Sequence, residues 1–180
     1  MTGEHPLPTT AYPPLPKLWV GYLLALVTFV GQGIAVSRHP ELLKQTQLTI
    51  APLEMFLPAF VASVYWLVCV YRYHVILARV PGWKHPISPA KAVGFHLIPL
   101  FYLVWIFIWP REVAKFVNGR LESDVMRGWF IGVGTIGAVA CEIFFDPAVG
   151  IALLFLTLRY LAVCLSRALA VDAAEHASQS

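Results

Sequence analysis

Charged residues and cysteines are scarce in this sequence. Only 13% of the 180 residues are Asp, Glu, Lys or Arg, whereas a soluble domain carries about a quarter. The net charge of +3 is spread over several short loops, which excludes the concentrated basic surface of a nucleic-acid-binding protein. The three cysteines lie inside apolar stretches and one of them must stay unpaired. A secreted disulfide scaffold is therefore excluded as well.

The usual sequence signatures of catalysis are also missing. There is no Gly-rich phosphate loop, no paired-cysteine motif, no G-x-S-x-G and no H-E-x-x-H. The segment 37–52, between the first two apolar stretches, is too short to form a soluble domain. We therefore expect a protein that is not an enzyme and that holds no metal ion.

Apolar residues, by contrast, are abundant and gathered into runs. They make up 58% of the chain, and a run of about 20 such residues is enough to cross a bilayer as a helix. The runs are 18–36, 53–71, 92–109, 128–145 and 147–165. This pattern predicts an all-α integral membrane protein in contact with the lipid bilayer. We expect three regions, namely a Pro-rich extended tail (1–17), a single transmembrane helical domain (18–166) and a polar C-terminal tail (167–180).

The third run, 92–109, is broken near its middle by Pro99. If all five runs cross, the Lys and Arg residues of the loops divide five against seven between the two sides, and the positive-inside rule then decides nothing. If the third run enters and leaves on one side, the division becomes 10 against 2, without Arg159. We therefore expect four transmembrane helices with both termini cytoplasmic, plus a re-entrant or interfacial third segment. A fifth span with a proline kink remains the alternative.

The fourth run carries small residues at helical spacing. Gly128 and Gly132 form one small-xxx-small pair, and Gly134 with Ala138 forms another. Such pairs let two helices approach closely in lipid, where van der Waals contact drives association. We expect this helix to pack inside the bundle, and dimerisation is the alternative.

Four polar residues interrupt the apolar runs: Glu54, His96, Glu142 and Arg159. Ionisable groups inside a membrane are costly, and they often mark ion or proton pathways. Glu142 and Asp146 are four residues apart, so on a continuous helix they could share a proton or bind a cation, or they could both reach interfacial water. We expect Arg159 to extend to the headgroups.

His96 lies among aromatic residues and is a candidate axial ligand for haem or chlorophyll. A second histidine at matching depth is not evident from the sequence. We therefore expect His96 to be a hydrogen-bonded polar residue, with the cofactor ligand as the alternative.

The segment 87–107 reads ISPAKAVGFHLIPLFYLVWIF. It resembles the pattern SP-x-x-AVGF-x-x-IP-x-x-N-x-x-W-x-F of an uncharacterised family of small bacterial multi-spanning membrane proteins, many of them from cyanobacteria. Leu103 stands where many members carry Asn. The resemblance continues through 109–112 and 116–118, covers about a fifth of the chain, and implies no known reaction. It implies a bacterial cytoplasmic membrane or an internal membrane such as the thylakoid.

From these features we expect a non-enzymatic accessory or assembly subunit of a larger membrane complex, for example an energy-transducing one. Its partners would be other membrane protein subunits. One alternative is a small ion or solute transporter or channel that uses the Pro99 break together with Glu54 and Glu142. A second alternative is a subunit that binds haem or chlorophyll through His96.

Overall fold

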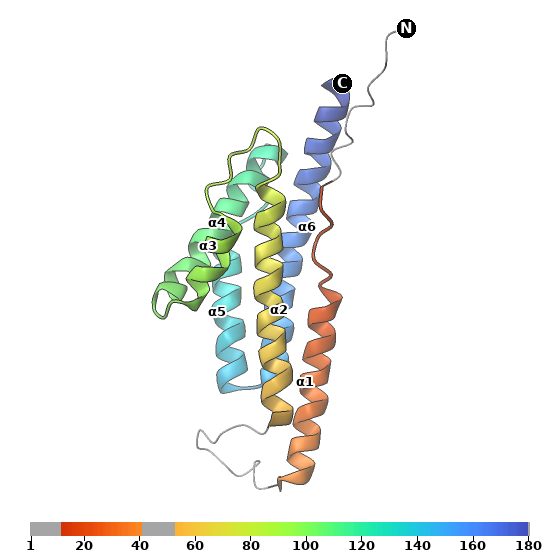
Figure 1. Cartoon of the computed structure of the whole chain (residues 1–180), viewed down its shortest axis with the longest axis vertical. Coiled ribbons are helices and arrows are strands. Elements are labelled where there is room, and N and C mark those ends of the chain that lie inside the picture. The colour runs from red at the N-terminus through yellow and green to blue at the C-terminus, as the bar shows by residue number, and fades with distance from the viewer. Residues whose placement is uncertain (1–11, 41–52, 180) are drawn as a thin grey trace.

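The computed structural model describes residues 12–40 and 53–179, and in this part of the chain it contains helices and no strands (Figure 1). The elements are α1 (Trp19–Arg38), α2 (Leu53–Leu77), α3 (Pro89–Gly94), the short 3₁₀ helix η2 (Phe95–Leu97), α4 (Phe101–Leu121), α5 (Gly128–Phe144) and α6 (Pro147–Gln179). The predicted all-α fold is therefore confirmed for the described residues.

Three of these helices are long and apolar enough to cross a membrane: Trp19–Arg38, Phe56–Leu77 and Pro147–Glu175. α5 is a shorter apolar helix of 17 residues, about 25 Å long at 1.5 Å per residue. In Figure 1 the helices α1, α2, α5 and α6 run side by side along the long axis. α6 contacts α1, α2, α4 and α5, so it forms the centre of the bundle.

The third apolar run does not form one helix. α3 and η2 end at Leu97, and the chain reverses before α4 begins at Phe101. The reversal is centred on Leu100, which has a φ of 65°, and the Phe101 N–H donates to the Pro99 carbonyl over 2.7 Å. This is a γ-turn with positive φ, a strained conformation for a residue with a side chain. Residues 92–109 are therefore two arms of a hairpin.

The open end of this hairpin, where α3 begins and α4 ends, lies toward one end of the bundle (Figure 1). Arg120, near the end of α4, donates through Nη2 to the carbonyl of Pro81 over 3.5 Å. The rings of Trp83 and Phe116 lie 5.4 Å apart. The tip of the hairpin is apolar and open to the surroundings, since Leu100 is 82% exposed.

The packed structure extends beyond both limits of the predicted domain. α6 continues to Gln179, so most of the region predicted as a polar tail is helical. Asp172 is fully buried there, because Arg120 Nη2 lies 2.7 Å from its Oδ1 and the Tyr12 hydroxyl donates to its carboxylate. Residues 12–17 are not helical, and Tyr12 and Leu15 pack against the core. The part of the predicted tail before residue 12 lies outside the described residues.

The small residues of α5 face other helices of the same chain. A Cβ built on Gly128 would lie 2.6 Å from Arg111 Cα, and one on Gly132 would lie 2.4 Å from the Phe107 ring. On the side towards α6, a Cβ on Gly134 would lie 2.6 Å from the Thr157 side chain. Ala138 is buried in the core. These four small residues therefore serve packing within the bundle.

Candidate functional site

A cavity of about 290 Å³ lies between the hairpin and the helices α2, α5 and α6. Most of its wall is apolar, with polar atoms supplied by Ser63, Trp66, His96, Tyr102 and Glu142. These side chains come from four different elements: α2, η2, α4 and α5. The reversal at Pro99 is what brings η2 and the start of α4 to the same cavity.

His96 and Trp66, which line the cavity, each carry a fully buried polar atom without a hydrogen-bond partner in the described part of the chain. His96 Nδ1 lies 2.7 Å from the carbonyl of Ala92, so Nδ1 donates and carries the ring proton. His96 Nε2 is left as an acceptor, and neither it nor Trp66 Nε1 has a hydrogen-bond partner among the described residues. Leaving a buried polar atom unpaired costs about 1–3 kcal/mol.

The hairpin fixes the position of His96 through contacts between its own arms. Ser88 caps α3 by accepting a backbone N–H, and Pro89 at the first helical position has a φ already suited to a helix. Trp105 Nε1 donates to the Ala92 carbonyl over 3.0 Å. The Phe95 ring lies 4.8 Å from the Trp105 ring. The segment that carries the family resemblance is the segment that builds this hairpin.

A second polar cluster lies nearer the end of the bundle where the hairpin begins. His74 Nδ1 and His85 Nε2 are 2.7 Å apart, so one ring donates to the other. His74 is fully buried. Burial also lowers the pKa of His85, against an opposing effect of the Glu112 carboxylate. This shift favours the neutral form of His85, which can donate to or accept from His74 according to its tautomer.

Trp109 separates the His74–His85 pair from His96. Its ring centroid lies 5.8 Å from that of His74 and 6.2 Å from that of His96, and the side chain is fully buried. Because Trp109 packs against both imidazoles, the space between them has no room for a planar macrocycle with two histidine ligands. In the described part of the chain, no group of three or more His, Cys, Asp or Glu residues is placed to hold a metal ion.

Together these residues form a series of titratable side chains along the bundle. It starts at His85 in the loop after α2, continues through His74 and His96, and reaches Glu142, which is one turn from the far end of α5. Sequence reasoning missed the His74–His85 pair, because the two residues are 11 apart and belong to no local motif. The signal was the turn-forming pair Pro81-Gly82 after α2, which returns the loop that carries His85 to the side of that helix.

The other polar residues singled out from the sequence are placed differently. Asp146 does not continue the helix of Glu142, because α5 ends at Phe144; its Oδ1 instead accepts the Val149 N–H at the start of α6. Glu54 lies on α2, and its side chain lies outside what the structure describes.

Arg159 is not near the middle of the bundle, despite its place within an apolar run. It is exposed. The neighbouring Tyr160 hydroxyl donates to the Val125 carbonyl (3.2 Å) and accepts the Arg127 N–H (3.3 Å). Arg159 is therefore level with the beginning of α5.

Comparison of the chain with protein-family models, curated proteins and solved structures finds no match.

Proposed function

We propose that this is a non-enzymatic membrane protein in which α1, α2, α5 and α6 cross the bilayer and the hairpin α3–η2–α4 is re-entrant. Both termini would then be cytoplasmic. The contact between Pro81 and Arg120 supports this topology, since it joins the two flanks of the hairpin at one end of the bundle. Arg159 lies level with the beginning of α5, at the same end of the bundle, and counts as one more cation on that side. In the proposed topology the Lys and Arg residues then divide 11 against 2 between the two sides of the membrane. The resemblance favours a bacterial cytoplasmic or thylakoid membrane.

We further propose that the protein moves protons across this membrane. The observation that carries the proposal is the series of titratable groups from His85 to Glu142, which extends through most of the bundle. An imidazole accepts a proton at one nitrogen and releases it from the other, and the hydrogen bond between His74 and His85 provides one such step. Intramembrane chains of this kind serve as proton relays.

Protons suit this path better than hydrated ions or larger solutes. The fully buried Trp109 stands between the cavity and His74, so no open channel connects the two clusters. Within the cavity, which has room for several water molecules, bridging water can carry a proton, and passage on to His74 requires the Trp109 side chain to move aside. Glu142 and Tyr102 supply the polar partners there.

Flux measurements in proteoliposomes test this proposal. A potassium diffusion potential drives protons, and an enclosed pH-sensitive dye reports them. We expect flux above that of empty vesicles for the unaltered protein, and loss of most of it in Glu142→Gln and His96→Gln. Glu122→Gln is the matched control, because Glu122 is exposed in the connection after α4. Flux that equals that of empty vesicles, or that both variants retain in full, would refute the proposal.

A second candidate function, the accessory subunit of a larger membrane complex, is favoured by a groove between α5 and α6. The groove has a volume of about 710 Å³, and Gly134, Gly137 and Ala138 contribute to its wall. A Cβ on Gly137 would meet no atom within 4 Å, and Arg159 also lines the groove. Walls of small residues allow close approach of a partner helix in lipid.

Copurification tests this second candidate. After gentle solubilisation from its own membrane, the protein should migrate with partner subunits on a native gel, and Gly137→Leu should release them by filling the groove. Migration as a monomer before and after the substitution would count against a subunit role.

A further inference from the structure

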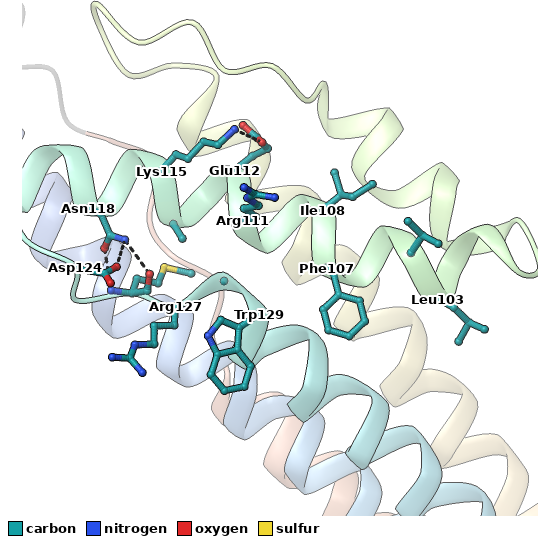
Figure 2. Close-up of a pocket in the computed structure, with 14 residues that line it drawn as sticks. Leu103, Phe107, Ile108, Arg111, Glu112, Lys115, Asn118, Asp124, Arg127 and Trp129 are labelled. Carbon is teal, nitrogen blue, oxygen red and sulfur yellow. Dashed lines mark hydrogen bonds and ion pairs between the residues drawn. The ribbon is translucent and has the colours of Figure 1, made fainter.

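A second groove, about 1100 Å³ in volume, lies between α4 and the beginning of α5 (Figure 2). It has an apolar half and a charged half. The apolar half is lined by Leu103, Phe107 and Trp129, and the charged half begins at Arg111 and Arg127. The two halves are continuous, because Arg111 follows Phe107 by about one turn of α4 and Trp129 follows Arg127 by two residues.

The acidic side chains of this groove already have partners within it. Glu112 Oε1 lies 2.6 Å from Lys115 Nζ. Asp124 Oδ1 accepts a hydrogen bond from Asn118 Nδ2 over 3.0 Å. Figure 2 shows both interactions along one side of the groove.

Arg111 and Arg127 are exposed, and neither forms an ion pair within the described part of the chain. Their backbones are held close together, because Gly128 allows contact with the main chain of α4: a Cβ there would lie 2.6 Å from Arg111 Cα and 2.7 Å from its nitrogen. Because these backbones are this close and both side chains are long and exposed, the two guanidinium groups can reach one anion, which would offset the repulsion between their charges. A phosphate group also matches the planar donor set of a guanidinium.

The apolar half identifies the source of that phosphate. Leu103 is 53% exposed and Trp129 is 55% exposed. In the proposed topology both face lipid, with Trp129 just below the cytoplasmic headgroups and Leu103 about 12 Å deeper along α4 than Arg111. Tryptophan at this depth is typical of a membrane interface. A free phosphate ion would leave this apolar surface unused, whereas an acyl chain attached to the phosphate would cover it.

We propose that this groove is a binding site for an anionic glycerophospholipid of the cytoplasmic leaflet. The phosphate lies between Arg111 and Arg127, and one acyl chain lies against Leu103, Phe107 and Trp129. The lipid site rests on the proposed topology and not on proton transport. A failure to bind lipid therefore leaves proton transport testable, and a failure to transport protons leaves lipid binding testable.

Fluorescence quenching by brominated lipids tests the site. The full chain is reconstituted in nanodiscs of phosphatidylcholine that contain a small fraction of dibrominated phosphatidylglycerol or, in parallel, dibrominated phosphatidylcholine. We expect the anionic lipid to quench more strongly, and we expect Trp129→Phe to remove the excess quenching. Arg111→Gln with Arg127→Gln should lower the preference for the anionic lipid about tenfold.

Two control variants separate the site from general surface charge and from misfolding. Arg79→Gln removes an exposed cation at the same end of the bundle and outside the groove, and the preference should survive it. Arg111→Lys with Arg127→Lys keeps both charges and should retain most of the preference. Equal quenching by the two lipids in the unaltered protein, or an equal loss of preference in Arg79→Gln, would overturn the proposal.

Discussion

The contact between α4 and α5 makes a quantitative prediction about Gly128. In Gly128→Ala the new methyl group would lie 2.6 Å from Arg111 Cα. An ordinary contact needs at least 3.4 Å, so the two helices would have to separate by about 0.8 Å in an otherwise close-packed region. Backbone atoms cannot rotate away as a side chain can, and overpacking of this kind costs about 1–3 kcal/mol.

Gly137→Ala is the matched control, since it makes the same chemical change on the same helix. A methyl group at this position meets nothing within 4 Å, and replacement of Gly by Ala inside a helix stabilises it by up to about 1 kcal/mol. We therefore expect the two variants to differ by about 1–4 kcal/mol in the free energy of unfolding, which is at least about fivefold in the equilibrium constant.

Denaturation by sodium dodecyl sulfate in mixed micelles, followed by circular dichroism, measures this difference. We expect Gly128→Ala to unfold at a lower detergent mole fraction than the unaltered protein, and Gly137→Ala at an equal or higher one. Equal stability of the two variants would refute the reasoning, because it would mean that α4 does not approach α5 closely at Gly128.

Two further predictions concern the end of the bundle where the hairpin begins. Arg120→Gln leaves the fully buried Asp172 without its cation, so we expect the free energy of unfolding to fall by about 3 kcal/mol in the same assay. The control Arg79→Gln should lower it by less than about 0.5 kcal/mol. Equal losses in the two variants would contradict the pairing of Arg120 with Asp172. Burial lowers the pKa of His85 in the folded protein, so below about pH 6.5 the unfolded chain binds more protons than the folded one. The free energy of unfolding should therefore fall as the pH is lowered from 7 to 5. If His85→Gln leaves this pH dependence unchanged, His85 is not its source.

The sequence predicted the hairpin because two independent features agreed on it. Pro99 interrupts the apolar run 92–109, and the count of Lys and Arg favoured a segment that returns to its own side. It did not predict the turn at Leu100, because a positive φ is not expected of a leucine. Contacts between the two arms of the hairpin, such as the hydrogen bond from Trp105 to the Ala92 carbonyl, hold that turn in place.

The candidate site was predicted in part. Glu142 and His96 were selected as polar residues inside apolar runs, and the structure brings them to one cavity. The predicted pairing of Glu142 with Asp146 does not form, because it required a helix that continues to Asp146, whereas α5 ends at Phe144. His74 and His85 are 11 residues apart, a spacing that belongs to no local motif.

The limits of the packed domain were the least predictable feature. Residues 167–179 mix charged and polar residues with apolar ones that are mostly alanine, so they carry only a weak hydrophobic signal of burial. Asp172 is nevertheless fully buried because Arg120, over 50 residues earlier in the chain, pairs with it. Such a pair depends on tertiary structure alone.

Cysteine labelling in intact cells tests the re-entrant hairpin most directly. Lys84 and Lys115 flank the hairpin and are both exposed; each is replaced by Cys in a chain whose three native cysteines have been changed to Ser or Ala. Phe145→Cys, in the exposed connection between α5 and α6, marks the opposite end of the bundle. We predict that a membrane-impermeant maleimide labels Phe145→Cys in intact cells and labels the other two variants only after the membrane is opened. Labelling of Lys84→Cys and Lys115→Cys from opposite sides would contradict the fold-back topology.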